Sequence, residues 1–240
     1  MSPRPSVLVG ALRATGLALG AAFAVTAVLR RSKPLHPEGD VAEGVLEVGP
    51  TGPPSGIALV DGAGTHACVV RASYAVGTGP RLPDIEGFAL RVGTGAVGGI
   101  EDVLFASTGG GPASRHVLLV RPPGHHRTQT TLLPVRAAGR PVVLRLEPVD
   151  RDTQPWPTAY ELSWAHVGRD WHPFGRLTVA RWDTGDAPTR FDPVTNPLRG
   201  TTQYAAVEGL REPAYRLSRR AWAAARGPDF VSSRRRRSSS

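Results

Sequence analysis

The sequence has little of several residue types that define other classes of protein. Its 240 residues include one cysteine, Cys68, which excludes an intrachain disulfide framework and any multi-cysteine metal site. Cys68 lies in a strand-like apolar stretch, so we predict a buried, unreactive thiol. Lys33 is the single lysine. This arginine bias is typical of GC-rich coding, and it lowers the weight that any one arginine carries as a candidate ligand.

The body of the chain carries no net positive charge. The formal charge of +9 comes from the two ends, because residues 1–33 hold five basic residues and no acid, and residues 234–237 are four arginines. Residues 34–233 are balanced. The body therefore has no overall field that would attract a phosphate backbone, and we expect no nucleic-acid partner. No segment of 20 to 50 residues repeats, which excludes solenoids and propellers.

Turn-forming residues are abundant, with 28 glycines and 23 prolines. This content excludes an all-α bundle and favours many short strands. The apolar stretches between turns indicate an antiparallel β-barrel or sandwich. The candidate strands are Gly44–Val48, Ile57–Val60, Ala67–Arg71, His116–Val120, Pro141–Leu146, Tyr160–Trp164 and Gly175–Ala180. One helix is predicted, Pro213–Arg226, with proline near its first turn and Gly227-Pro228 as its stop.

An apolar segment lies near the N-terminus. Residues 14–29 carry no charge, and arginines flank them on both sides. We consider three interpretations: a packed or interfacial helix whose arginines meet anionic lipid, a spanning anchor slightly short of the usual length, and a cleaved signal peptide. A membrane surface, contacted through residues 7–31, is therefore a candidate partner. The expected location is cytoplasmic or membrane-associated, with secretion as the signal-peptide alternative.

Three domains follow from these patterns. Residues 1–33 form an apolar N-terminal helix or membrane-associating segment, and residues 34–230 form the barrel domain. Residues 231–240 form a disordered Arg/Ser tail, because such low-complexity sequence has nothing to bury.

Two short motifs suggest chemistry by themselves. His125-His126-Arg-Thr128 is compatible with phosphoester cleavage, but the chain has no second His-x-Thr motif and no carboxylates at metal-ligand spacing nearby. Gly109–Gly111 lacks the Lys-Ser/Thr and helix of a phosphate loop, so a hairpin turn is predicted. No Gly-x-Ser-x-Gly motif is present, and nothing else indicates a serine hydrolase.

A third set of motifs is informative because of its order. The chain reads His36-Pro-Glu-Gly39 before a strand, then Arg71-Ala-Ser73, then Asp84-Ile-Glu-Gly-Phe-Ala-Leu-Arg91, then Glu101-Asp102-Val-Leu-Phe105, and finally Arg211-x-x-x-Tyr215. In this order the chain resembles the haem catalase superfamily, in particular its short catalase-like members. The resemblance covers about residues 34–226.

The resemblance implies a haem b cofactor and a set of site residues. His36 would be the distal histidine that moves a proton between the oxygens of a peroxide. Tyr215 would ligate the haem iron through its phenolate, and Arg211, one helical turn earlier, would hydrogen-bond that phenolate. Arg71 would pair with a haem propionate.

The sequence also departs from the family pattern. Full catalases have an asparagine shortly after the Asp-Leu strand, and here that stretch offers Ser107 as the distal hydrogen-bond donor, or no donor. Pro213 lies between Arg211 and Tyr215, and the chain is much shorter than a full catalase.

We therefore expect an α+β protein: a single antiparallel β-barrel of catalase-like type with an N-terminal apolar helix and a C-terminal covering helix. Its expected function is haem binding with weak peroxidase-type activity on peroxide or a lipid-like hydroperoxide. Two alternatives stay open, a non-enzymatic catalase-fold barrel that has lost haem and a phosphodiesterase that uses His125 and His126.

Overall fold

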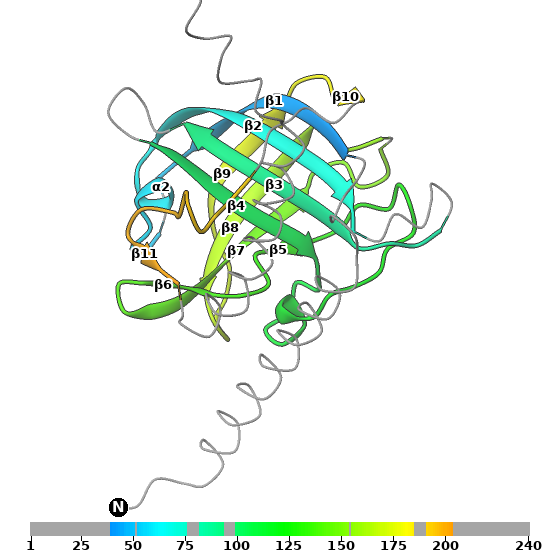
Figure 1. The fold of residues 1–240 in the computed structure, drawn as a ribbon. Coiled ribbons are helices and arrows are strands. Elements are labelled where there is room, and N and C mark those ends of the chain that lie inside the picture. Colours follow the sequence, from blue (N-terminus) through cyan, green and yellow to red (C-terminus); the bar gives the residue numbers. More distant parts are fainter. Residues whose placement is uncertain are drawn as a thin grey trace, which may run out of the picture.

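The structure is a computed structural model that describes residues 39–50, 52–75, 82–93, 99–153, 155–184 and 191–203. These residues form a β-barrel with little helix (Figure 1). The strands are β1 (Gly39–Val48), β2 (Gly64–Tyr74), β3 (Glu86–Gly93), β4 (Ile100–Ser107), β5 (Gln129–Thr130), β6 (Val135–Ala137), β7 (Arg140–Pro148), β8 (Ala159–His166), β9 (His172–Val179), β10 (Asp183–Thr184) and β11 (Thr201–Thr202). The helical elements are α2 (Ala58–Asp61) and the 3₁₀ turn η1 (Ser114–His116).

Eight strands close the barrel, in the order β1-β2-β3-β4-β5-β7-β8-β9 and back to β1. Every pairing between them is antiparallel, and β7 closes the ring because it pairs with both β5 and β8. Strands β6 and β10 pair with further residues of β7 and β1, and β11 pairs with β6. Closure leaves the eight strands no free edge, which protects a β-protein from edge-to-edge association. The predicted antiparallel barrel is confirmed.

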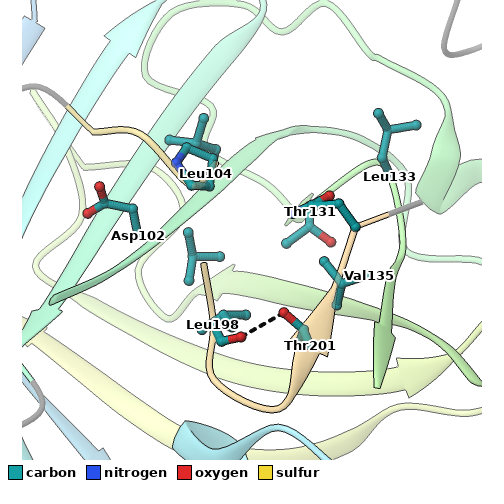
Figure 2. A pocket seen from close by; sticks show the side chains of 10 residues that line it. Asp102, Leu104, Thr131, Leu133, Val135, Leu198 and Thr201 are labelled. Carbon is teal, nitrogen blue, oxygen red and sulfur yellow. Dashed lines mark hydrogen bonds between the residues drawn. The ribbon is translucent and has the colours of Figure 1, made fainter. Parts of the chain in front are cut away.

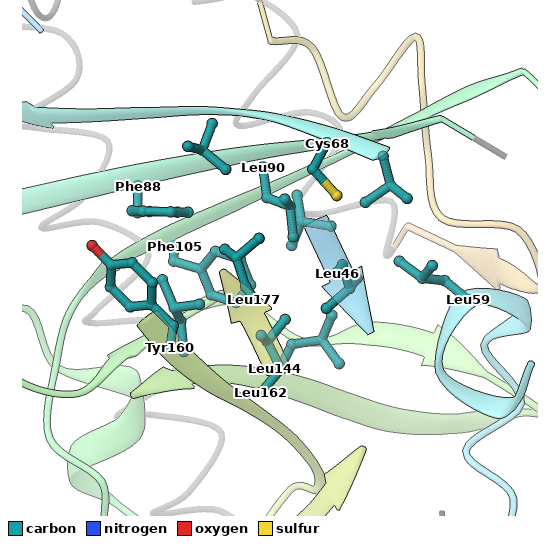
Figure 3. Packing of buried hydrophobic residues seen from close by; sticks show 14 of the residues in the cluster. Leu46, Leu59, Cys68, Phe88, Leu90, Phe105, Leu144, Tyr160, Leu162 and Leu177 are labelled. Carbon is teal, nitrogen blue, oxygen red and sulfur yellow. The ribbon is translucent and has the colours of Figure 1, made fainter. Parts of the chain in front are cut away.

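The barrel interior is a packed apolar core. Side chains alternate between the two faces of each strand, so every second residue points inward. Phe88 and Leu90 of β3 face Leu162 and Leu177 from the opposite wall, and all four are almost fully buried (Figure 3). Such a filled barrel has no room for a cofactor in its centre, so any large ligand must lie outside it.

The thiol of Cys68 belongs to this core. Burial raises its pKa to about 11, and the side chain is almost completely buried. The prediction of a buried cysteine is therefore confirmed.

One predicted strand is a helix instead. Ile57–Val60 was expected to be extended, but Ala58–Asp61 forms the single turn α2. The cause is the Asp61 carboxylate, which accepts hydrogen bonds from the backbone N–H of Ser55 and of Gly56, both at 2.8 Å. These local bonds fold the apolar segment into a turn, which apolar patterning alone does not predict.

A second predicted strand, His116–Val120, is mostly irregular. Its first residue ends η1, and its remaining ladder contact is an isolated bridge between Leu118 and Thr108. The chain thus reverses between Thr108 and Leu118 over a loop that contains both Gly109–Gly111 and η1, which is longer than the predicted hairpin turn.

Both predicted helices lie outside the described residues. The apolar segment 7–31, the C-terminal helix 213–226 and the tail 231–240 are in this category, and the domain boundaries stay predictions. Within the described ranges, no helix has the length and apolar character needed to cross a membrane.

Candidate functional site

Arg71 lies on the outer face of the barrel, near the end where β1 begins. Its chain neighbours Val70 and Ala72 belong to the core, so the Arg71 side chain points outward. Arg71 pairs with Val41 of β1 and with Ala89 of β3.

The Arg71 guanidinium lies directly against Gly39, the first residue of β1. A Cβ atom built on Gly39 would lie 2.7 Å from both Cζ and Nη2 of Arg71, closer than real Cβ atoms come. A larger residue at this position would therefore require the Arg71 guanidinium to move from its place. Gly39 is three residues after His36 in the sequence.

The outer face around Arg71 carries small side chains. Ser73 pairs with Gly39 and Gly87, and Gly87 pairs with Ala106 of β4, so these four residues form one row across the sheet. We call Arg71 and this row the Arg71 face. The side chains of this row are small, and Ser73 is 5% exposed.

Ser107 does not belong to the Arg71 face. It is one residue after Ala106 and therefore points to the inner side, where it is 1% exposed. Its hydroxyl donates to the Leu119 carbonyl at 2.6 Å and accepts from the Glu86 backbone N–H at 3.1 Å. The single O–H of Ser107 is thus committed to a structural bond. On the Arg71 face, β4 offers the methyl group of Ala106, which cannot donate a hydrogen bond.

The other three predicted site residues, His36, Arg211 and Tyr215, lie outside the described residues. Arg71 and Ser107 are the two that the structure describes, and it places them on opposite faces of the sheet.

A buried hydrogen-bonded pair closes the same end of the barrel from inside. His126 Nδ1 lies 2.8 Å from Glu86 Oε1, and the two side chains are 2% and 0% exposed. His126 Nε2 lies 3.0 Å from the Thr153 carbonyl oxygen, and Gln129 Nε2 lies 3.4 Å from Glu86 Oε2. Because a carbonyl can only accept, Nε2 is the donor in the bond to Thr153.

Two tyrosines near this pair have raised pKa values. Burial, followed by the negative charge of Glu86, raises the pKa of Tyr74 to about 12 and raises the pKa of Tyr160 well above its ordinary value. Both phenols therefore stay protonated at neutral pH.

Trp156 packs against His126 at the same end of the barrel. Its Nε1–H donates to Asp40 Oδ2 at 2.6 Å, and its ring lies 4.8 Å from the Tyr74 ring and 5.1 Å from the His126 ring, centroid to centroid. Trp182 follows at 6.5 Å. Loops far apart in the sequence thus converge on one aromatic and acidic cluster.

The two histidines of the phosphodiesterase alternative have different environments. His126 is buried with both ring nitrogens occupied, whereas His125 is exposed and lies 3.2 Å from Asp152. Phosphoester cleavage needs both rings at one accessible site, and this arrangement does not provide it. In the described part of the chain, no three His, Cys, Asp or Glu residues gather as metal ligands would.

A small cavity lies elsewhere, between β4, the segment that follows β5, and β11 (Figure 2). Its volume of about 30 Å³ holds about one water molecule and is far too small for a haem. Leu104, Thr131, Val135 and Thr201 line it, and the Thr201 hydroxyl donates to the Leu198 carbonyl at 2.7 Å. The Arg71 face is therefore the better candidate for a large flat ligand.

The sequence analysis did not identify Glu86, Asp40 and Trp156 as site residues, and it considered His126 only for phosphoester cleavage. A buried position for Glu86 could have been inferred, because it shares the inward parity of Phe88 and Leu90 in β3. The partners of Glu86 could not, since His126 is 40 residues further along the chain.

Comparison with known proteins supports the fold. No family model and no curated protein matches the sequence. Among solved structures, a bacterial catalase matches with a TM-score of 0.51 and 14% identity, covering 76% of this chain and 56% of the catalase. A fungal catalase matches with a TM-score of 0.51 and 12% identity, covering 73% and 56%, and catalase A from Saccharomyces cerevisiae with 0.51 and 10%, covering 78% and 60%. The chain thus spans a little over half the length of these catalases, and it shares the fold of their barrel.

Proposed function

We propose that this barrel binds haem b on the Arg71 face and uses it for weak peroxidase-type chemistry. The observation that carries the proposal is the packing of the Arg71 guanidinium on Gly39, in a barrel with the catalase fold. A guanidinium beside a row of small side chains is suited to hold the carboxylate of a flat ligand by charge-assisted hydrogen bonds.

The described residues of the Arg71 face support a haem site. Small side chains cover the row from Gly39 to Ala106, so a macrocycle can lie close to the strands. In this arrangement Arg71 would bind a propionate, and Tyr215 would ligate the iron with Arg211 as its hydrogen-bond donor. Bound haem supplies a redox-active iron at which peroxides are cleaved.

His36 would act on the proton. A neutral imidazole takes a proton from the near oxygen of a peroxide at one ring nitrogen and returns it to the far oxygen. His36 precedes Gly39 by three residues in the sequence, and Gly39 is the residue against which the Arg71 guanidinium packs.

Weak activity is expected because the described residues of β4 place no hydrogen-bond donor on the Arg71 face. Ala106 is the β4 residue on the Arg71 face, and the Ser107 hydroxyl is bonded to Leu119 on the other side. Without a donor from β4 to orient the peroxide, dismutation loses positioning energy. The apolar segment 7–31 favours a lipid-like hydroperoxide as substrate, delivered from a membrane surface.

The methyl group of Ala106 also favours a second candidate, a catalase-fold barrel that has lost haem and acts without catalysis. Binding of hemin to the purified full-length chain separates the two. We expect a stoichiometric Soret band that is displaced in Tyr215→Phe and kept in Tyr160→Phe, which removes a phenol buried inside the barrel. A spectrum identical to free hemin would overturn the haem proposal and favour the non-enzymatic barrel.

A further inference from the structure

The tryptophans of the described residues differ in what their indole N–H contacts. Trp156 donates to a carboxylate, Asp40 Oδ2, at 2.6 Å. The others do not: Trp182 donates to the Pro157 carbonyl at 3.1 Å, Trp171 donates to the Gly110 carbonyl at 2.8 Å, and Trp164 Nε1 is buried without a hydrogen-bond partner.

This difference decides which indole is most readily oxidised. Loss of one electron turns an indole into a radical cation, whose N–H is a much stronger acid than the N–H of the neutral ring. A carboxylate within hydrogen-bond distance can take that proton, whereas an amide carbonyl cannot. Trp156 is therefore the one indole of this set that can lose an electron and a proton together.

The charged groups next to each indole also favour oxidation of Trp156 over Trp171. Trp171 lies beside two guanidinium groups, with Arg115 Cζ at 4.2 Å and Arg145 Cζ at 4.8 Å from its ring centroid. Positive charge at this distance opposes the formation of a cationic ring. Trp156 instead contacts the Asp40 carboxylate, which favours it.

Trp156 is also next to the Arg71 face. Asp40 follows Gly39 in β1 and points inward, so one strand separates the Trp156 indole from the Arg71 guanidinium. On its other side, the half-buried Tyr74 ring lies 4.8 Å from Trp156. The two rings connect the inner side of β1 to the protein surface.

We propose that Trp156 is a redox-active residue that delivers one electron to an oxidant bound on the Arg71 face. The Nε1–H bond breaks, its proton goes to Asp40 Oδ2, and the electron reduces the oxidant. The oxidant is a haem that peroxide has oxidised, so this step rests on the proposed function. A small phenolic reductant at the surface returns the electron and loses its own proton to solvent, while Asp40 returns its proton to Nε1 and the indole is restored.

The site of oxidation can be measured without haem. The full-length chain would carry Trp222→Phe, because Trp222 lies outside the described residues. Photo-excited tris(bipyridine)ruthenium, quenched by hexaamminecobalt(III), supplies the one-electron oxidant, and transient absorption detects the indole radical.

We expect a long-lived neutral tryptophan radical that is lost in Trp156→Phe and kept in the matched control Trp182→Phe. Asp40→Asn keeps a hydrogen-bond acceptor but removes the base, so the spectrum should shift to the protonated radical cation. A neutral radical that survives Trp156→Phe, or an unchanged spectrum in Asp40→Asn, would overturn the assignment.

Coupling to haem needs a second measurement. Freeze-quenched electron paramagnetic resonance of the hemin-loaded chain after peroxide should show a protein radical that is absent from Trp156→Phe. If hemin binds and no such radical forms, the coupling is wrong although the haem proposal stands. If hemin does not bind, haem is excluded as the oxidant, and the photochemical result reports on Trp156 alone.

Discussion

Glu86 and His126 form a buried pair, 2.8 Å apart, that closes one end of the barrel. Glu86 begins β3, and His126 lies in the loop before β5. The pair therefore fixes that loop to the wall of the barrel, beside the Trp156 ring. Each partner depends on the other, because a single charged group at this depth would have neither water nor a partner to stabilise it.

Removal of one partner should be costly. Glu86→Ala leaves His126 facing a cavity, and we expect the free energy of unfolding to fall by about 3 kcal/mol. Urea denaturation followed by tryptophan fluorescence measures this. The exposed control Glu161→Ala should change stability by less than about 0.5 kcal/mol, and equal effects of the two variants would contradict the buried pair.

Ser107 should contribute stability rather than bind haem. Ser107→Ala removes the bonds to Leu119 and Glu86, so we expect a loss of about 2 kcal/mol in the free energy of unfolding. Hemin affinity should be unchanged in equilibrium titrations. A large loss of hemin affinity with normal stability would show that Ser107 faces the haem.

The turn between β6 and β7 is strained and can be improved. Ala138 and Gly139 have φ values of 46° and 78°, and both occupy the left-handed region in a two-residue hairpin turn. A non-glycine residue there costs about 1–2 kcal/mol, and asparagine tolerates this conformation best. Ala138→Asn should therefore raise the free energy of unfolding by about 1 kcal/mol in urea denaturation. Unchanged or lower stability would mean that the turn adopts another conformation.

His116 should make stability depend on pH. Burial lowers its pKa below the ordinary 6.5, and the positive charge of Arg115 adds to this, while a bond from Nδ1 to the Leu132 carbonyl opposes it. Below pH 6.5 the unfolded chain therefore binds the proton more readily than the folded chain does, and stability falls as the pH falls.

His116→Asn should remove this contribution, because its side-chain amide can replace the Nδ1 donor and does not titrate. Urea midpoints measured between about pH 5 and pH 7 should fall less steeply for this variant than for the natural chain. Parallel curves would show that His116 does not contribute.

The barrel was predictable because its signals are local. Two predicted strands each consist mainly of apolar residues between turns, and each lies within an observed strand. They are Gly44–Val48 and Pro141–Leu146. Ile57–Val60 was not predictable, because the Asp61 bonds that fold it come from outside the apolar segment. Apolar pattern alone does not separate a short strand from a helical turn.

The candidate site was predictable only in part. Arg71 was identified by its place in an ordered set of motifs, and the outward parity of its strand agrees. Ser107 was selected by its distance along the chain, yet a shift of one residue moves a side chain to the other face of a sheet. The Trp156–Asp40 bond spans 116 residues, and only the closed barrel brings its partners together.

The affinity of the purified full-length chain for hemin, compared with Arg71→Ala and Arg176→Ala, tests the central claim most directly. Arg176 is an exposed arginine of β9 in the same barrel and serves as the matched control. A charge-assisted hydrogen bond contributes about 1.5–3 kcal/mol, so Arg71→Ala should raise the Kd for hemin by about tenfold or more, and Arg176→Ala should leave it unchanged. Equal affinities for all three proteins, or no saturable binding, would contradict a haem site on the Arg71 face.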